Sequence, residues 1–424
     1  MTKSIVSIVK GNDPEKMVEE ALSLLGGSAL IKPGSTIVIK PNAGHPSPPE
    51  TAGCTSPEMV SAVIKVLRKA KPKEIIVAEA GAIGCDTVEC FEVSGIGKAA
   101  ENAGADKVVD IKREKDLIKV PIRDARSDIT QIILPKFLIE AEHIVNLPIF
   151  KPHVAMVYTC ALKNLKGLVQ DKVHYQMHQT NLADAMFDVW SVVRADLNIV
   201  DMIRPQEGFG PQNGLPVDFG CVLASKDPVA VDATCCRMVG LDVDTVSYFG
   251  AARKRNLGNF HERNIEIRGR AIKEVFKPMW LPYLGGFGQW PEYEVYEESA
   301  CSSCQGLIAY SLERLKAEGE YDKNAGVSIV FGRKKDLPKV PPKNLILVGN
   351  CLKNKRDKGI FVGGCPPNEG AIVWSIVNRQ EWSRPDVMNG TYKRNAEMVA
   401  QSAKPMLDHS KKLREKIIAE KLKK

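Results

Sequence analysis

Four cysteines in the last third of the chain have the residue type and setting of metal ligands. Cys301 and Cys304 are separated by two serines, so their thiolates can reach one metal centre. Cys351 and Cys365 each come just after a short apolar segment that we expect to be a strand, where a rigid element holds a ligand in place. Together the four thiolates predict a metal centre.

The residues around Cys365 favour an iron–sulfur cluster over zinc. Gly363 and Gly364 allow close backbone approach and direct N–H groups at sulfur, and Pro366 stiffens the loop. Zinc ribbons usually pair one Cys-x-x-Cys with a second, and here the second pair is divided. We therefore predict a 4Fe–4S cluster, with a structural Zn²⁺ ion or unligated thiols as alternatives.

Seven further cysteines are expected to pack in the interior. Free cysteine commonly behaves as a small buried hydrophobic residue, and nothing in the spacing of these seven suggests a ligand set. They are Cys54, Cys85, Cys90, Cys160, Cys221, Cys235 and Cys236.

Composition limits the class of protein. The 424 residues are 44% hydrophobic and 26% charged, which is typical of a globular protein of two or three domains. The net charge of +8 is modest, and aromatic residues are only 6% of the chain, so no nucleic-acid partner is expected. We find no apolar run long enough for a membrane span and no signal-like N-terminus, which predicts a cytoplasmic protein without membrane association.

The elements that must position these residues form an α/β pattern. Mostly continuous apolar runs alternate with helical periodicity, which favours a mostly parallel sheet flanked by helices. The expected strands are 35–39, 74–78, 107–111, 143–147, 198–201 and 219–224, and the expected helices are 57–70, 182–193 and 229–239.

A change of composition divides the chain. We expect an α/β domain over 1–276, a Pro-, Gly- and aromatic-rich crossing over 277–298, a smaller cysteine-rich α/β domain over 299–400 and a basic C-terminal helix over 401–424. Within the cysteine-rich domain the expected elements are a helix at 307–317, strands at 327–331, 345–348 and 360–362, and a helix from 369.

Polar residues cluster where the expected strands end. Ligands of open parallel sheets bind beyond the carboxyl ends of the strands. Lys40 and Asn42 follow one strand, and Lys151 and His153 follow another. Other strand-end residues are Glu79, Asp201 and Asp227, the last of which is also an ordinary helix N-cap. Lys163 and Lys166 add ammonium groups that suit a carboxylate or phosphate ligand.

Four segments resemble one family. They are IVIKPN (37–42), NLPIFKPH (146–153), TCALKNLKGLV (159–169) and ASKDPVAVDATCCRMVGLD (224–242). In this order they resemble the family catalogued as domain of unknown function 362, over roughly residues 5–245. The resemblance implies site residues at Lys40, Asn42, Lys151, His153, Lys163, Asn164 and Asp232. Many members carry an iron–sulfur module with closely spaced cysteines, whereas the cysteines here are spread out, so a ferredoxin fold is not expected.

These observations predict an iron–sulfur oxidoreductase that passes electrons to an anionic small molecule, with a redox protein as a further partner. Lys151, His153 and Lys163 are the predicted catalytic residues, and His153 handles a proton. The predicted substrate-binding residues are Lys40, Asn42, Asn164 and Asp232. The alternatives are a cluster-dependent lyase or isomerase with one spared ligand position, a cluster carrier or assembly protein, and a zinc-stapled enzyme.

Overall fold

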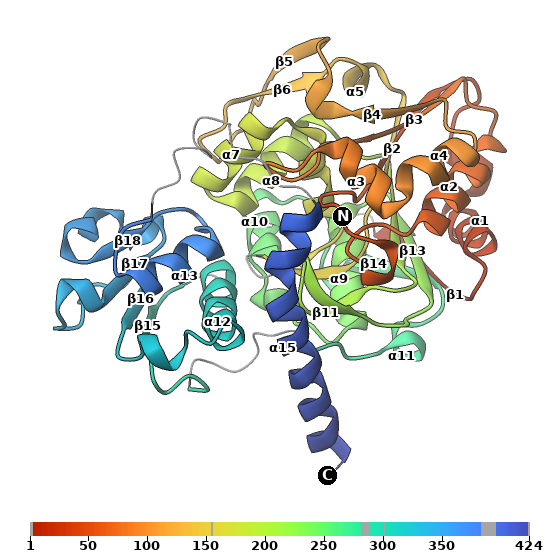
Figure 1. Ribbon diagram of the computed structural model, residues 1–424. Helices are drawn as coiled ribbons and strands as arrows, with labels where there is room; N and C mark the ends of the chain where they lie inside the picture. The colour runs from red at the N-terminus through yellow and green to blue at the C-terminus, as the bar shows by residue number, and fades with distance from the viewer. Residues whose placement is uncertain (1–2, 154–155, 281–287, 301, 383–395, 423–424) are drawn as a thin grey trace.

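The computed structural model describes residues 3–153, 156–280, 288–300, 302–382 and 396–422. Figure 1 shows a large α/β unit and a smaller one, with the long C-terminal helix α15 at their junction. None of the described helices is both long and apolar enough to cross a bilayer.

The large unit is built on an eight-stranded sheet with the order β14-β1-β13-β10-β7-β2-β3-β4. Its strands are β1 (Ser4–Lys10), β2 (Thr36–Pro41), β3 (Glu74–Glu79), β4 (Lys107–Asp110), β7 (His143–Leu147), β10 (Leu197–Met202), β13 (Cys221–Ser225) and β14 (Ile265–Gly269). Every neighbouring pair is parallel except the two pairs that β13 makes, with β1 and β10. The mostly parallel α/β sheet expected from sequence is therefore confirmed, and β13 is its antiparallel exception.

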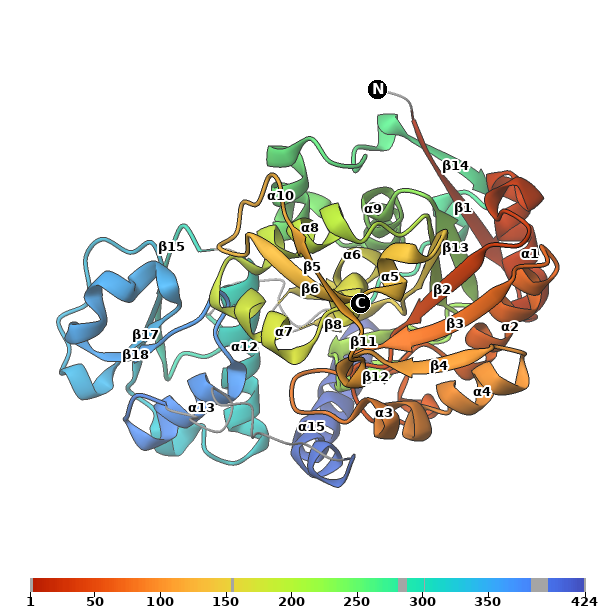
Figure 2. The same cartoon turned by 90° about the horizontal axis from the view of Figure 1, so that it is seen from above.

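Helices cover both faces of this sheet because successive strand residues face opposite sides (Figure 2). Ile37 and Ile39 pack in the core that includes α1 and α2, while Val38 packs in the core that includes α8 and α9. The first layer holds α1 (Pro14–Leu25), α2 (Pro57–Arg68), α3 (Thr87–Ser94) and α4 (Ile96–Asn102). The second holds α6 (Ala161–Asn164), α7 (Asp171–Gln179), α8 (Leu182–Val192), α9 (Pro228–Met238) and α10 (Ser247–Arg255).

The smaller unit has a four-stranded sheet in which every pair is parallel. It contains β15 (Glu294–Glu298), β16 (Ser328–Gly332), β17 (Leu345–Val348), β18 (Ile360–Val362), α12 (Ser302–Ala317) and α13 (Glu369–Asn378). Leu307 of α12 and Ile372 of α13 belong to the same apolar cluster as Leu182 of α8. The two units therefore share one continuous hydrophobic core.

Three hairpins and two short helices complete the large unit. The hairpins are β5 (Leu117–Pro121) with β6 (Gln131–Pro135), β8 (Lys151–His153) with β9 (Val157–Thr159), and β11 (Gln206–Phe209) with β12 (Asn213–Pro216), and the helices are α5 (Phe137–Glu140) and α11 (Ile272–Val275).

Helix α15 (Ala396–Leu422) contacts the β11–β12 hairpin and α12. Its Ser410 Oγ donates to the Asn213 carbonyl oxygen at 3.2 Å, and Arg414 pairs with Glu207 at 3.0 Å. The terminal helix thus joins both units at their boundary.

A buried ion pair links α8 to α10. Arg255 Nη1 lies 2.7 Å from Asp188 Oδ1, and the two side chains are 6% and 0% exposed. Asp188 also accepts hydrogen bonds from the backbone N–H groups of Arg126 and Ser127. The pair therefore joins both helices to the loop after β5.

Replacing Arg255 by alanine is expected to lower the free energy of unfolding by about 3–5 kcal/mol, because Asp188 would keep a buried charge without its cation. Denaturant unfolding followed by circular dichroism measures the loss. Arg253→Ala, on the same helix with an exposed partner in Asp244, serves as the matched control and should cost much less. Equal losses in the two variants would contradict this assignment.

Candidate functional site

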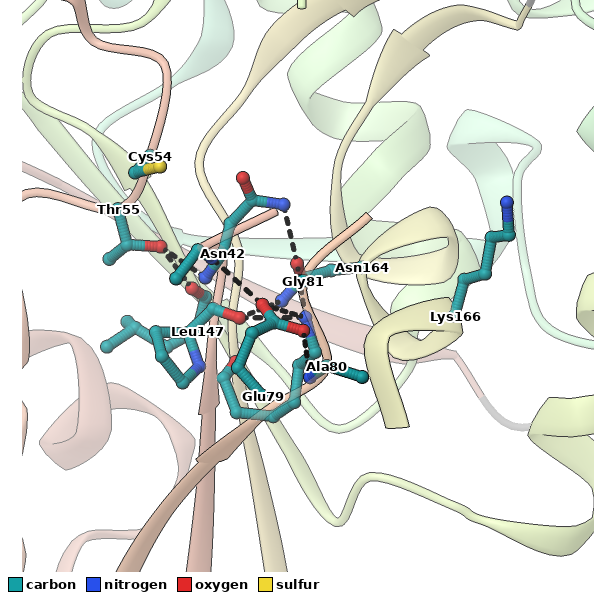
Figure 3. A network of polar contacts seen from close by, with 12 residues as sticks. Asn42, Cys54, Thr55, Glu79, Ala80, Gly81, Leu147, Asn164 and Lys166 are labelled. Carbon is teal, nitrogen blue, oxygen red and sulfur yellow. Dashed lines mark hydrogen bonds and ion pairs between the residues drawn. The ribbon is translucent and has the colours of Figure 1, made fainter. Parts of the chain in front are cut away.

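A buried ion pair between Lys40 and Glu79 lies at the centre of the polar residues. Figure 3 shows Glu79 among Asn42, Ala80 and Asn164. Lys40 Nζ is 2.7 Å from Glu79 Oε2, and both side chains are 1% exposed. The same ammonium donates to Asn164 Oδ1 at 3.0 Å and to the Pro41 carbonyl oxygen at 2.8 Å. An ammonium has three donors, so these partners occupy all of them. Lys40 is therefore fully paired within the protein, and its predicted substrate-binding role stays a prediction.

Glu79 is held by backbone groups as well. Its Oε2 accepts from the N–H of Ala43 at 2.8 Å, and its Oε1 accepts from the N–H of Ala80 at 3.0 Å. Burial raises the pKa of Glu79 and lowers the pKa of Lys40, and the attraction between them opposes both shifts. Sequence reasoning noticed Glu79 only as a strand-end residue and did not place it in the site.

A chain of amide side chains extends from this pair across the sheet. Asn42 Nδ2 donates to Asn164 Oδ1 at 2.9 Å, and Asn164 Nδ2 donates to Asn146 Oδ1 at 2.8 Å. Asn146 Nδ2 in turn donates to Asn198 Oδ1 at 2.9 Å. The structure thus joins the predicted residues Asn42 and Asn164, and it adds Asn146 and Asn198 to the network. The sequence feature that could have identified Asn146 and Asn198 is an amide side chain within an otherwise apolar strand.

Lys151 lies on β8 and extends the network to the loop before α2. Its Nζ donates to Asn42 Oδ1 at 2.9 Å and to the Gly53 carbonyl oxygen. Burial lowers the pKa of Lys151 to about 8. His153 lies two residues further on the same strand, so its side chain is on the same face as Lys151, and it is half-buried.

Lys40, Lys151 and Lys163 form what we call the lysine cluster, and of these three lysines Lys163 alone is half-buried rather than buried. No described residue forms a hydrogen bond or an ion pair with its ammonium. Burial lowers the pKa of Lys163 well below its usual value, and the ammonium groups of Lys166, Lys151 and Lys40 lower it further. Lys166 itself points away from the Lys40–Glu79 pair (Figure 3).

Asp232 of α9 positions the helix that carries Lys163 and Asn164. Its carboxylate accepts from the N–H of Ala161 at 2.8 Å and from the N–H of Leu162 at 3.2 Å. These groups begin α6, and Asp232 is fully buried, so in this structure Asp232 holds the start of that helix, while its predicted substrate-binding role stays a prediction. Burial raises the pKa of Asp232 to about 7.

The charges of this cluster are unbalanced. Lys40, Lys151 and Lys163 converge, whereas Glu79 is the one carboxylate that pairs with them in the described part of the chain. A groove of about 590 Å³ lies elsewhere, between α1, α2 and α4, and none of the cluster residues lines it. The excess positive charge makes the lysine cluster suited to an anion.

The described cysteines of the predicted metal centre lie at one edge of the small sheet. Cys304 is in the first turn of α12 after β15, Cys351 is the second residue of a 3-10 segment (Asn350–Lys358) after β17, and Cys365 follows β18. Because all four strands are parallel, these segments meet at the carboxyl edge.

Contacts at Gly349 show how closely the segments approach. A Cβ added at Gly349 would lie 3.4 Å from Cys304 Sγ and 3.8 Å from the Gly364 carbonyl oxygen. The N–H of Asn350 donates to that carbonyl at 2.9 Å, and Asn350 Oδ1 accepts from the N–H of Gly364 at 2.9 Å. The loops before Cys351 and Cys365 are thus tied together beside Cys304.

The metal itself remains a prediction. Cys304 is buried, Cys351 is exposed and Cys365 is half-buried, while Cys301 lies outside the described residues. Within the described residues, no three His, Cys, Asp or Glu side chains group closely enough to hold a metal ion.

Two contacts bring the cysteine segments to the lysine-bearing unit. The carbonyl oxygen of Cys365 accepts from the N–H of Leu182, the first residue of α8, at 3.3 Å. Helix α12 contacts β9, which pairs with β8 and therefore with the strand of Lys151. The two predicted sites lie on adjoining elements.

Other sequence predictions are confirmed. All seven cysteines expected to pack are buried. Asp227 is the N-cap of α9, accepting from the N–H groups of Val229 and Ala230. Asp201 is buried and accepts from the N–H and hydroxyl of Ser56, so it supports the start of α2.

Gly167 permits the closest approach in the cluster. Its carbonyl oxygen accepts from the N–H of Ala80, and a Cβ at this position would lie 1.9 Å from Glu79 Oε1 and 2.6 Å from Lys40 Nζ. No side chain fits there without displacing the ion pair.

Gly167→Ala is therefore expected to lower the free energy of unfolding by at least about 2 kcal/mol. Gly250→Ala is the control, because nothing lies within 4 Å of the added methyl group and the residue is inside α10. That control should be neutral or gain up to about 1 kcal/mol. Thermal and denaturant unfolding check both, and an unchanged Gly167→Ala protein would refute the packing argument.

Comparison with solved structures finds only weak similarity. The lactate racemase apoprotein of Thermoanaerobacterium thermosaccharolyticum has a TM-score of 0.40 and 11% identity, covering 96% of this chain and 91% of that chain. A Thermotoga maritima protein has a TM-score of 0.34 and 14% identity over 51% of this chain. This chain spans 57% of that second protein, less than two thirds of its length. Neither similarity is strong enough to bear on function.

Comparison of sequences is more informative. A thylakoid-associated protein of Synechocystis sp. is 27% identical over 279 residues, which is 61% of this chain and 83% of that protein. The family model described as domain of unknown function (DUF362) matches residues 37–237. The matched range contains Lys40, Glu79, Lys151, Lys163 and Asp232. The match to the DUF362 family therefore covers residues 37–237 of this chain, in agreement with the resemblance of its sequence segments.

Proposed function

We propose that this chain is an iron–sulfur oxidoreductase that exchanges electrons with an anionic small molecule bound at the lysine cluster. The observation that carries this proposal is the contact between the two predicted sites. The Cys365 carbonyl oxygen accepts from Leu182 of α8, and α12 contacts the hairpin that bears Lys151. Electron exchange requires such neighbouring placement of cluster and substrate.

The anion is proposed from the excess of ammonium groups. Burying a charge without a partner costs several kcal/mol, so a carboxylate or phosphate group that offsets the lysines would bind favourably. Lys163 has no protein partner among the described residues and reaches the surface, so it is the first contact for this group. Lys151 is the second, because the described contacts use two of its three donors.

The remaining residues act by position or by proton transfer. Lys40, Asn42 and Asn164 hold one another and fix the lysine-bearing segments. His153, on the same face of β8 as Lys151, is the proposed proton donor or acceptor.

Cys301, Cys304, Cys351 and Cys365 are the proposed ligands of a 4Fe–4S cluster. Bound there, the cluster would supply or accept one electron at a time. Two observations support this proposal: thiolates are the ligands that such a cluster requires, and the segments carrying Cys304, Cys351 and Cys365 meet at one sheet edge beside Gly349. A zinc-stapled enzyme, a cluster-dependent lyase or isomerase, and a cluster carrier remain the alternatives.

Anion binding is expected to weaken as the pH rises, because the pKa values of both proposed contact lysines, Lys151 and Lys163, are lowered. The pKa of Lys151 is lowered from its usual value to about 8, so the free protein loses this ammonium above that pH. A bound anion favours the ammonium form, so binding takes up a proton and the affinity falls by up to about tenfold per pH unit. Sulfate is the probe, because it does not titrate in this range.

Isothermal titration calorimetry in buffers of different ionisation enthalpy measures both affinity and proton uptake. Lys163→Met should abolish most of the binding, whereas Lys73→Met, at an exposed position outside the cluster, should not change it. A sulfate affinity that is independent of pH and unchanged in Lys163→Met would contradict the proposed anion site.

Anaerobically purified protein is expected to be brown, to contain iron and sulfide, and to bleach with dithionite. Cys351→Ser should lose this colour because it removes a ligand, while Cys54→Ser, at a buried packing position, should keep it. Metal and sulfide analysis with EPR before and after reduction makes the measurement.

Colourless protein with stoichiometric zinc would reject every cluster function. Full retention of the cluster after loss of one of the four cysteines would instead favour the lyase or isomerase, because such enzymes spare one ligand position.

A further inference from the structure

Most of the net charge of the chain lies in one short stretch. Residues 333–358 contain nine lysines and arginines but only two aspartates, a formal charge of +7, whereas the whole chain carries +8. We call these nine residues the basic strip. They are Arg333, Lys334, Lys335, Lys339, Lys343, Lys353, Lys355, Arg356 and Lys358.

The basic strip borders the exposed cysteine of the predicted metal centre. Residues 333–335 follow the carboxyl end of β16, and the 3-10 segment that contains Cys351 follows the carboxyl end of β17. Lys355 Nζ donates to the Lys334 carbonyl oxygen at 2.6 Å, so the two stretches are in contact. Cys351 itself is exposed. Positive charge from residues 333–335 and from Lys353 and Lys355 therefore lies at the sheet edge where a cluster beside Cys351 would come nearest to solvent.

The fold does not use most of these charges. Lys334 pairs with Glu298 at 3.5 Å, Arg356 with Glu381 at 3.4 Å, and Lys358 with the adjacent Asp357 at 2.9 Å. Within the described part of the chain the other members form no ion pair, and Arg333, Lys335, Lys339, Lys343 and Lys353 are exposed. Like charges held this close repel, so a partner that neutralises them is favoured.

We propose that the basic strip is the docking surface for an acidic protein that carries electrons. This proposal rests on the proposed function and names its redox partner. Cys351 and the other three proposed cysteines would hold a cluster that could take up the single electron given up by a reduced carrier as that carrier is oxidised. Complementary charge would speed the encounter and make it sensitive to salt.

Two features favour a protein over a nucleic acid or a lipid surface. The stretch 333–358 contains no aromatic residue on which a base could stack. None of the large hydrophobic side chains that are exposed among the described residues lies in the strip, so nothing there would insert into a bilayer.

The test uses the full chain with its cluster and an acidic 2[4Fe–4S] ferredoxin as the probe. The variant Arg333→Glu/Lys335→Glu/Lys353→Glu is expected to bind ferredoxin about tenfold or more weakly and to accept its electrons correspondingly more slowly. Raising the salt concentration should weaken the wild-type complex and leave the variant nearly unchanged.

The matched control is Lys73→Glu/Lys115→Glu/Lys119→Glu, which makes the same change of net charge at exposed positions of the large unit. It should bind ferredoxin within about twofold of wild type. Salt screens charges that lie farther from the docking surface than a Debye length, so charges on the large unit should contribute little. Both variants must keep the iron content and melting temperature of the wild type, so that lost binding reports the surface.

The outcomes separate the two proposals. Wild-type protein without iron and sulfide overturns the proposed function and this inference together. Protein with its cluster whose ferredoxin binding survives the triple reversal overturns the docking surface alone. Duplex DNA and vesicles of equal parts phosphatidylglycerol and phosphatidylcholine are tested in parallel. If either binds the wild-type protein more tightly than ferredoxin does, and this binding is lost in the triple variant, the basic strip is assigned to that partner instead.

Discussion

The ion pair between Lys40 and Glu79 is the interaction on which the rest of the polar site depends. Burying both charges is expensive, and it is tolerated only when good geometry and further hydrogen bonds satisfy each group. Here the ammonium has three acceptors, and each carboxylate oxygen also accepts from a backbone N–H. The segments that carry these hydrogen-bond partners are therefore held in fixed positions around the ion pair.

Because all the hydrogen-bond donors of Lys40 are used within the protein, we propose different roles for the lysines of the site. Lys40 has no donor left, so it organises the site, and Asn164 connects it to the amides that run across the sheet. Asp232 fixes the other end of the short helix α6. Lys163 is positioned by these contacts and forms no hydrogen bond or ion pair with a described residue, which is why we propose it as the residue that contacts a ligand.

The same geometric rule builds both predicted sites. In parallel sheets the carboxyl ends of all strands lie at one edge, so residues far apart in the chain meet there. The large sheet gathers Lys40 and Glu79 in this way, and the small sheet gathers the segments of Cys304, Cys351 and Cys365. A shared hydrophobic core and the contact of Cys365 with α8 hold the two edges in a fixed relation.

Local patterns in the sequence determined the elements well. The strands 143–147, 345–348 and 360–362 have the expected bounds, because continuous apolar runs between turn residues specify a buried strand. Helix α2 begins at Pro57 as expected, since proline suits the first helical position. The buried cysteines and the match to the DUF362 family were also readable from residue type and order.

Tertiary structure alone decided what depends on a distant partner. The apolar run of β13 fits either strand direction, and its neighbours β1 and β10 make it antiparallel. The ion pair of Lys40 with Glu79, on the next strand, could not be read from either residue's local sequence. Gly167 gave no local signal, because its small size matters only where the fold presses it against that pair. The sequence determines which donors and acceptors a side chain has. Only the tertiary structure determines which of them are already used by neighbouring residues.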